Sequence, residues 1–139
     1  MSTEKSRKEA ERWLSTADDD LDTARILKKN KKYAHACFHA QQAGEKAVKA
    51  VWYFLDSDPW GHSIKKLIDD LVRIDKKVYN SLKNLGKNGM ILDRFYIPTR
   101  YPNGLPEITP DLAFAEEDAI NCIDLAQLIL DKVKDITGL

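Results

Sequence analysis

A short break at Asn30 separates two long stretches of the sequence that carry helical periodicity. The first is expected to begin near Ser6, which has capping-box spacing to Glu9. Its apolar residues follow one helix face: Ala10, Trp13, Leu14, Ala17, Leu21 and Ala24. The second covers residues 32–55 and has small residues in the middle of its apolar stripe. Because a connection this short makes its two helices run antiparallel, this half of the chain is predicted to form a helical hairpin.

Turn and capping signals divide the remainder of the chain. Ser63 is suited to cap a third helix after a loop at residues 56–61, and Gly86 and Gly89 predict a kink or two short helices further on. Four prolines then recur every four residues, and each biases the residue before it towards an extended conformation: Pro98, Pro102, Pro106 and Pro110. Residues 97–109 are therefore predicted to be a non-helical loop, and Thr109 with Pro110 is predicted to start the last helix.

Length and composition bound the fold class. The chain has 139 residues, of which 43% are hydrophobic and 32% charged, and it shows no strand pattern and no repeat. A chain of this length can bury a core without a disulfide or a metal, so Cys37 and Cys122 are expected to be buried, reduced thiols. We predict a single all-α domain over residues 1–139, folded as an antiparallel up-and-down four-helix bundle with an additional short helix and a Pro-rich loop.

The net charge is zero but unevenly distributed, with eight acids and two bases in residues 107–139. Basic residues gather instead within residues 28–32 and 65–77. A general duplex-DNA binder has a strongly basic face, whereas this pattern favours a small anionic ligand. No apolar run reaches the roughly 18 residues that a membrane span requires, and residues 1–12 are polar. We therefore expect a cytoplasmic protein with no membrane association.

Few residues suggest chemistry by their spacing. No phosphate-binding loop and no nucleophilic motif is present. His35 and His39 have the i, i+4 spacing of a metal-binding pair, but no carboxylate completes a metalloprotease pattern. We interpret them as polar surface or interface histidines, and we expect no metal and no cofactor. His62 is interpreted as a cap of the third helix. The acids within residues 18–22 are interpreted as a solvated helix face, because consecutive carboxylates on a helix point in different directions.

Arg100 is the centre of a candidate anion site. The prolines stiffen the loop that carries it, and Tyr96 and Tyr101 flank it. A guanidinium can hold a phosphate through two hydrogen bonds, and tyrosine rings can stack on a base. Lys46 and Gln42 on the second helix would add donors if the loop folds over that helix. In the alternative, Arg100 pairs with an acid of the last helix and only pins the loop; physical reasoning from the residues leaves both open.

Two segments in a fixed order give the chain a family resemblance: QQAGEKAVKA at residues 41–50 and YIPTRYP at residues 96–102. With His62, Ser63 and the apolar positions of the outer helices, the chain resembles the prokaryotic HEPN domains over nearly its whole length. The resemblance implies a helical bundle that commonly forms a homodimer, and binding of a nucleotide such as ATP or AMP. It also implies a minimal nucleotidyltransferase subunit as partner, in a toxin–antitoxin-like pair. Many members of the family are metal-independent ribonucleases that use an arginine followed four to six residues later by a histidine.

The chain departs from that ribonuclease pattern because no histidine follows Arg100. Acid–base cleavage of RNA needs a group that titrates near neutral pH, so we transfer Arg100 as a ligand contact and assign no catalytic residue. The favoured interpretation is a nucleotide-binding, non-catalytic partner of a nucleotidyltransferase. Two alternatives stay open. One is a divergent ribonuclease in which the fold brings His39 or His62 to Arg100, and the other is a ligand-free structural or regulatory dimer with Phe38 or Trp52 in its interface.

Overall fold

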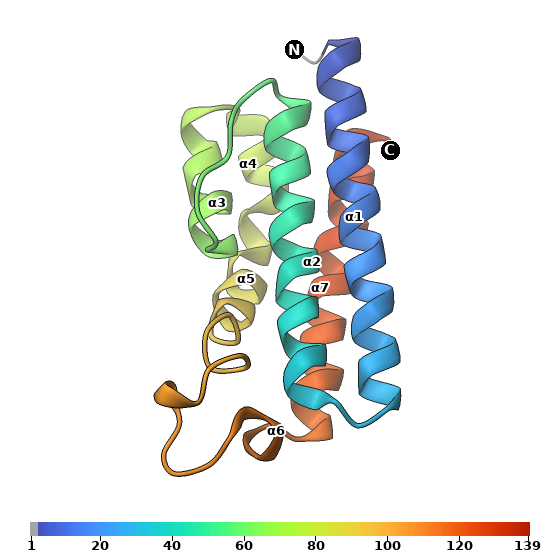
Figure 1. The fold of residues 1–139 in the computed structure, drawn as a ribbon. Helices are drawn as coiled ribbons and strands as arrows, with labels where there is room; N and C mark the ends of the chain where they lie inside the picture. Colours follow the sequence, from blue (N-terminus) through green and yellow to red (C-terminus); the bar gives the residue numbers. More distant parts are fainter. Residues whose placement is uncertain (1–2) are drawn as a thin grey trace.

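The computed structural model describes residues 3–139, and every regular element within them is helical (Figure 1). Helix α1 (Glu4–Lys29) and α2 (Tyr33–Phe54) form the predicted antiparallel hairpin. The chain then rises through α3 (Ile64–Asp70) and descends through α4 (Lys76–Leu82) and α5 (Gly86–Asp93). A loop and the one-turn helix α6 (Pro110–Ala113) lead to α7 (Glu116–Thr137), which runs antiparallel to α1. The predicted all-α up-and-down bundle is confirmed, with the fourth column built from three short helices.

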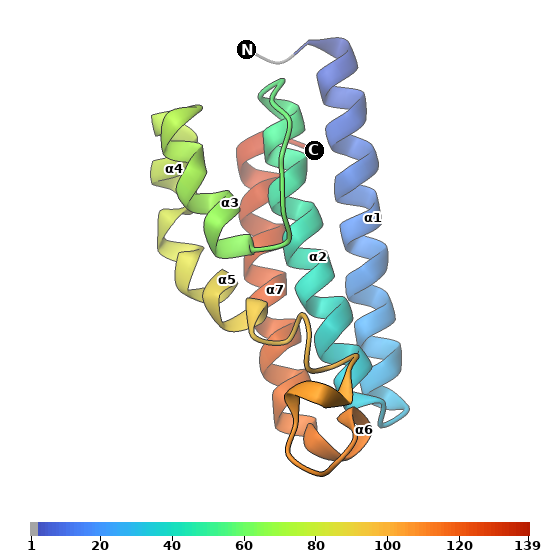
Figure 2. The same cartoon turned by 60° about the vertical axis from the view of Figure 1, so that its left-hand side comes forward.

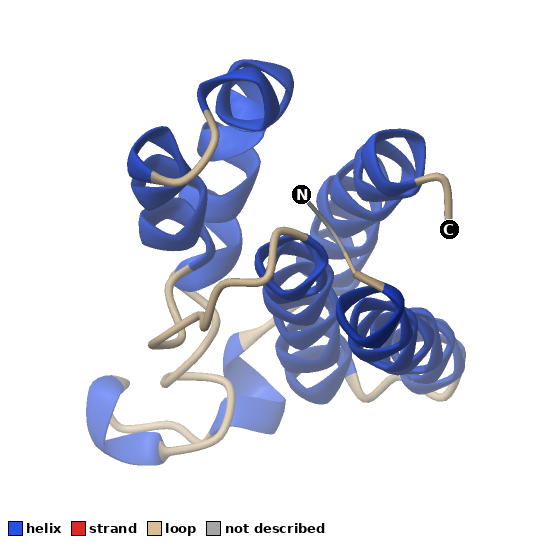
Figure 3. Ribbon diagram, turned by 90° about the horizontal axis from the view of Figure 1, so that it is seen from above, coloured by secondary structure: helices blue, strands red, loops and turns tan. Residues whose placement is uncertain are grey.

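The three long helices enclose most of the core. Seen along the bundle axis, α1, α2 and α7 form a triangle (Figure 3). Of the short helices, α3 and α5 contact α2, and α4 and α5 contact α7. Small side chains are fully buried along α1 and α2, and short side chains let helix axes approach closely: Ala10, Ala17, Ala24, Ala36, Ala40, Ala43 and Ala47. Cys37 of α2 and Cys122 of α7 are both buried and unbonded, as predicted. A hydrogen bond with Cys37, together with burial, raises the pKa of the Cys122 thiol, which therefore stays protonated.

Trp52 belongs to this core rather than to a docking surface. Only 6% of its surface is exposed, and its indole Nε1 donates a hydrogen bond to the carbonyl of Leu67, 3.1 Å away. The indole therefore ties α2 to α3, and the expectation that Trp52 would line a dimer interface is wrong. A buried tryptophan needs a partner for its N–H, and the end of α3 supplies that partner.

Two glycines mark the place where α2, α3 and α5 meet. A Cβ atom on Gly44 would lie 2.9 Å from Cδ1 of Ile64, and one on Gly89 would lie 2.6 Å from Cγ2 of the same residue. Gly89 is thus inside α5 and permits its close approach to α3. The two short helices predicted around Gly86 are confirmed, but the chain breaks just before that residue, through a 3₁₀ turn at Lys83–Leu85. A close packing contact, rather than a break, accounts for Gly89.

Two predicted helix starts are displaced. Thr3, not Ser6, is the N-cap of α1, since its hydroxyl accepts a hydrogen bond from the Ser6 amide. Thr109 with Pro110 begins only the single turn of α6, and α7 starts at Glu116 after an extended residue, Ala115. The predicted non-helical loop over residues 97–109 contains one 3₁₀ turn, Pro102–Gly104. Helix-start signals are local, so they locate a first turn without showing whether packing lets the helix continue. In the described residues no helix is both long and apolar enough to cross a membrane.

Candidate functional site

A row of four rings crosses the N-terminal half of α2. The segment after α5 comes up against this half of the helix (Figure 2). Its Tyr96 ring lies 6.2 Å from Phe38 of α2 and stacks on His62, at a centroid distance of 5.0 Å. His39 meets Phe38 edge-on, with ring centroids 5.5 Å apart. The order His39, Phe38, Tyr96, His62 therefore places one imidazole at each end of an aromatic pair.

The guanidinium of Arg100 lies over the centre of this row. Its Cζ is 4.5 Å from the ring centroids of both Phe38 and Tyr96, and 5.1 Å from that of Tyr101. Its Nε donates to the Tyr96 carbonyl at 2.9 Å. Aromatic faces attract a cation without using its hydrogen-bond donors, so both terminal nitrogens keep theirs. Among residues 3–139 no carboxylate is within 4.0 Å of Arg100, so the alternative in which it pairs with an acid of α7 is wrong.

The loop that carries Arg100 is fixed by its own backbone. The amides of Arg100 and Tyr101 both donate to the Ile97 carbonyl, at 3.1 and 3.2 Å. The buried Thr99 hydroxyl donates to the carbonyl of Phe95 at 2.5 Å. Phe95 in turn packs on Phe114, which follows α6, with ring centroids 5.7 Å apart. The guanidinium is therefore held in place before any ligand arrives, which lowers the entropy cost of binding.

His62 is the most constrained exposed side chain of the site. Its side chain is 60% exposed, yet its Nδ1 lies 3.3 Å from a carboxylate oxygen of Glu45. The Gln41 amide donates to the His62 carbonyl at 3.0 Å. The next residue, Ser63, caps α3, while the Asp93 carboxylate accepts from the hydroxyl of Ser63 and from the next two backbone amides. Buried groups thus fix both the ring and the backbone of His62, and in residues 3–139 its Nε2 makes no hydrogen bond. The interpretation of His62 as the helix cap is wrong, since Ser63 has that role.

Glu45 is the buried charge on which this arrangement depends. Its side chain is 4% exposed, and Lys49 donates to it at 3.0 Å. The side-chain amides of Gln41 and Gln42 each lie 3.5 Å from its other oxygen. A buried carboxylate is tolerated when it is paired and hydrogen-bonded, and these partners meet that condition. The network therefore offers the His62 ring a fixed acceptor.

Lys46 and Gln42, predicted as additional donors for the ligand of Arg100, each have a partner within the protein. Lys46 pairs with Asp20 of α1 at 2.7 Å, and His39 Nδ1 lies 3.7 Å from the same carboxylate. Gln42 donates to the side chain of Gln41 at 2.9 Å. Within residues 3–139 no hydrogen bond connects either residue to Arg100. Lys46 already has an anionic partner, so it is a poor donor for a second anion.

The interpretation of the acids within residues 18–22 as a solvated helix face is wrong for one of them, Asp20. Its side chain is only 14% exposed, whereas neighbouring Asp22 is 73% exposed. Burial alone raises the pKa of Asp20, but the interactions with His39 and Lys46 outweigh it and hold the pKa below the ordinary value. One member of the run is therefore part of the α1–α2 contact, which places a carboxylate behind His39.

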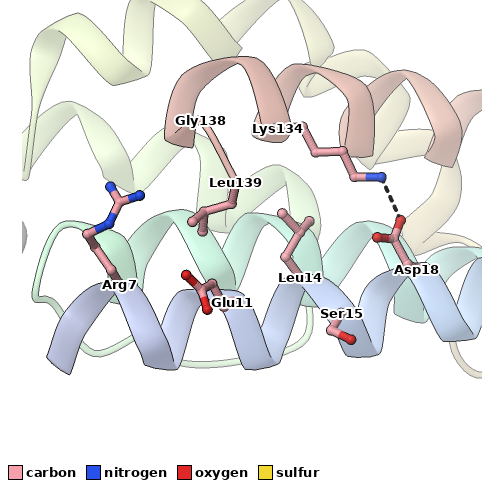
Figure 4. A pocket seen from close by; sticks show the side chains of 8 residues that line it. All are labelled: Arg7, Glu11, Leu14, Ser15, Asp18, Lys134, Gly138 and Leu139. Atoms are coloured by element: carbon pink, nitrogen blue, oxygen red, sulfur yellow. Dashed lines mark hydrogen bonds and ion pairs between the residues drawn. The ribbon is translucent and has the colours of Figure 1, made fainter. Parts of the chain in front are cut away.

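One charged hollow away from the ring row lies between the start of α1 and the end of α7. Figure 4 shows this cavity of about 510 Å³, with Asp18 and Lys134 paired at 2.8 Å on its wall. Its other lining residues come from both helices: Arg7, Glu11, Leu14, Ser15, Gly138 and Leu139. It holds no aromatic ring and no histidine. In residues 3–139 no group of three or more His, Cys, Asp or Glu side chains could hold a metal. The ring row is thus the stronger candidate site.

Comparison with known proteins gives this site a family context. A family model described as the HEPN domain matches residues 10–136 of the chain. The chain is 29% identical over 133 residues to a Methanocaldococcus jannaschii protein named "Putative toxin MJ1304", and the match covers 92% of this chain and 88% of that protein.

Solved structures share the fold. TT1696 from Thermus thermophilus has a TM-score of 0.77 and 35% identity, covering 91% of this chain and 96% of that one. ST0689, described as an archaeal HEPN homologue, has a TM-score of 0.71 and 35% identity, with 92% and 97% covered. A HEPN domain protein from Thermotoga maritima has a TM-score of 0.65 and 25% identity, with 91% and 98% covered.

Proposed function

The chain belongs to the HEPN domain family, and we propose that it binds the phosphate of a nucleotide at Arg100. We further propose that it is the toxin-side subunit of a toxin–antitoxin-like pair with a minimal nucleotidyltransferase. The observation that carries the binding proposal is the unpaired guanidinium of Arg100, held over Phe38 and Tyr96. Because the guanidinium lies on aromatic rings and not against a carboxylate, its terminal N–H groups remain available to an anion. A planar guanidinium can donate two parallel hydrogen bonds to the oxygens of one phosphate.

The pairing proposal rests on the relatives rather than on geometry. The name of the M. jannaschii protein includes the word toxin, and the match extends over most of both chains. Expression of this chain alone in a bacterial host is expected to arrest growth, and co-expression of a minimal nucleotidyltransferase is expected to relieve the arrest. Two results would contradict the pairing. One is relief of the arrest by a nucleotidyltransferase that does not bind the chain, and the other is normal growth when the chain is expressed alone.

The binding proposal is tested by titrating AMP and ATP into labelled protein and following backbone amides. We expect saturable shifts around residues 96–101 and 38–45. The variant Arg100→Ala is expected to lose binding. Arg94→Ala is the matched control, because Arg94 is an exposed arginine on the same segment and its loss changes the net charge equally. Equal binding by both variants would refute a role for Arg100, and circular dichroism would show that each variant keeps its helices.

A second function is favoured by one specific contact, the stacking of His62 on the ring that holds Arg100. A histidine near Arg100 supports metal-independent cleavage of RNA, and we propose that cleavage as the alternative activity. The 2′-hydroxyl would give its proton to Nε2 of His62 as its oxygen bonds to phosphorus. The bond to the 5′-oxygen would then break, and that oxygen would take the proton. Arg100 would neutralise the phosphate oxygens.

The cleavage alternative is tested with short single-stranded RNA in excess EDTA. His62→Ala is expected to abolish product formation, and Glu45→Gln to reduce it by removing the charge that faces the ring. His35→Ala is the control, because His35 is an exposed histidine near the start of α2, the helix that carries Glu45. RNA that stays intact with the wild-type protein would reject the cleavage and leave the binding proposal standing.

A further inference from the structure

Trp60 is the most exposed large hydrophobic side chain in the described residues, with 86% of its surface open to solvent. The other two tryptophans are covered. Trp52 is buried, and Trp13 stacks on Tyr53 with ring centroids 5.2 Å apart. Tryptophan is usually highly buried because of its large apolar surface. An indole left in water on an ordered loop therefore suggests a ligand that covers it.

The loop presents this ring from fixed ends. On one side, the Ser57 amide donates to the Trp52 carbonyl at 2.9 Å. On the other side, the Gln41 amide holds the His62 carbonyl at 3.0 Å. Between these anchors, Pro59 fixes its own φ and Gly61 adopts a φ of +90°, a conformation that glycine accepts readily. The backbone that carries Trp60 is thus anchored at both ends of the loop.

Trp60 is also close in the chain to the ring row. It is two residues from His62, so their Cα atoms are at most about 7 Å apart at ~3.3–3.6 Å per residue. The His62 ring stacks on Tyr96, and Tyr96 lies under the guanidinium of Arg100. The loop that carries Trp60 therefore leads directly into the histidine that stacks on the ring under Arg100.

We propose that Trp60 is the stacking platform for the base of the nucleotide whose phosphate binds at Arg100. This inference rests on the proposed function and adds that the ligand is recognised through its base as well as its phosphate. Every base has a π-face, so stacking on an indole is tolerant of sequence. A tryptophan that is a hot spot of a protein–protein interface is instead surrounded by further contacts that exclude water. The neighbours of Trp60 in its loop, Asp58, Pro59, Gly61 and His62, offer no second large apolar side chain.

The indole supplies its own signal for a test. We would titrate the full chain with AMP, ribose 5-phosphate and inorganic phosphate, following tryptophan fluorescence and, in parallel, heat of binding. AMP is expected to quench the fluorescence, whereas the two ligands without a base are expected to bind without quenching. Trp13→Phe is the control, because it removes a tryptophan that is covered by Tyr53 and should keep the quenching.

Substitution then separates the two proposals. Trp60→Ala is expected to weaken AMP binding by roughly 5- to 150-fold, the range for loss of one base–aromatic stack, and to leave ribose 5-phosphate binding unchanged. Trp60→Phe is expected to lose the quenching and retain most of the affinity. Unchanged AMP affinity in Trp60→Ala would overturn the stacking inference. If Arg100→Ala at the same time no longer binds any of the three ligands, the proposal of phosphate binding at Arg100 would still stand. Wild-type protein that binds none of the ligands would refute both. Loss of nucleotidyltransferase association in Trp60→Ala, with AMP binding intact, would assign Trp60 to a protein interface instead.

Discussion

The contact of Gly89 with Ile64 gives a stability prediction whose sign depends on the tertiary structure. Alanine is a better helix former than glycine by about 0.8–1.0 kcal/mol, and Gly89 is inside α5. Helix propensity alone therefore predicts that Gly89→Ala stabilises the protein. The structure predicts the opposite, because the added Cβ would lie 2.6 Å from Cγ2 and 3.0 Å from Cβ of Ile64, and 3.1 Å from the backbone nitrogen of Lys65.

These neighbours cannot move independently. Ile64 is fully buried, and its own Cδ1 lies only 2.9 Å from the position that a Cβ on Gly44 would take. Overpacking a filled core costs typically about 1–3 kcal/mol, and contact with branched and backbone atoms favours the upper part of that range. After subtraction of the propensity gain, we expect Gly89→Ala to lower the free energy of unfolding by about 1–2 kcal/mol. At this chain length that corresponds to a fall in Tm of roughly 3–7 °C.

Gly86→Ala is the matched control in the same helix. A Cβ there would meet only the Lys65 side chain, at an ordinary contact distance of 3.5 Å. We expect it to raise the free energy of unfolding by about 0.4–1 kcal/mol, through the lower entropy of the unfolded chain. Urea denaturation followed by circular dichroism at 222 nm measures both variants. Gly89→Ala at least as stable as the wild type would refute the packing explanation.

Two further predictions concern charged side chains. Asp93→Asn removes the charge that accepts from Ser63 and from two amides of α3. We expect this substitution to lower the free energy of unfolding, measured by urea denaturation, by about 1–2 kcal/mol. A change within about 0.3 kcal/mol, the level of ordinary surface changes, would contradict the capping role. Asp20 has a pKa lowered by folding, so the stability it adds is present above its ordinary pKa of 3.8 and is lost as the pH falls through the folded value. Asp20→Asn should therefore be less stable than the wild type at pH 7, and the gap should narrow below about pH 4; a gap that is the same at pH 7 and pH 3 would argue against the ion pair with Lys46.

Part of the candidate site was visible in the sequence. The proline-stiffened loop and its central Arg100 were identified from local signals, because proline restricts the residues beside it whatever the rest of the chain does. Tyr96 and Tyr101 were identified as ring partners for the same reason. Local patterns indicate only a dimer interface for Phe38, and they assign no role to Glu45. His62 was open only as an alternative, because nothing local shows that it faces Tyr96.

The sequence by itself determined the helical bundle. Helical periodicity, the short turn at Asn30 and the Ser63 cap are properties of neighbouring residues, and each was enough to place an element of the fold. Only the tertiary structure decided which side chains meet: that Lys46 pairs with Asp20, that Arg100 rests on rings rather than on an acid, and that Gly89 is a contact rather than a break. Contacts between residues far apart in the chain depend on how whole helices pack. A short-range pattern carries no information about the partner across the bundle, so the site became visible only when α2, the loop before α3 and the segment after α5 came together.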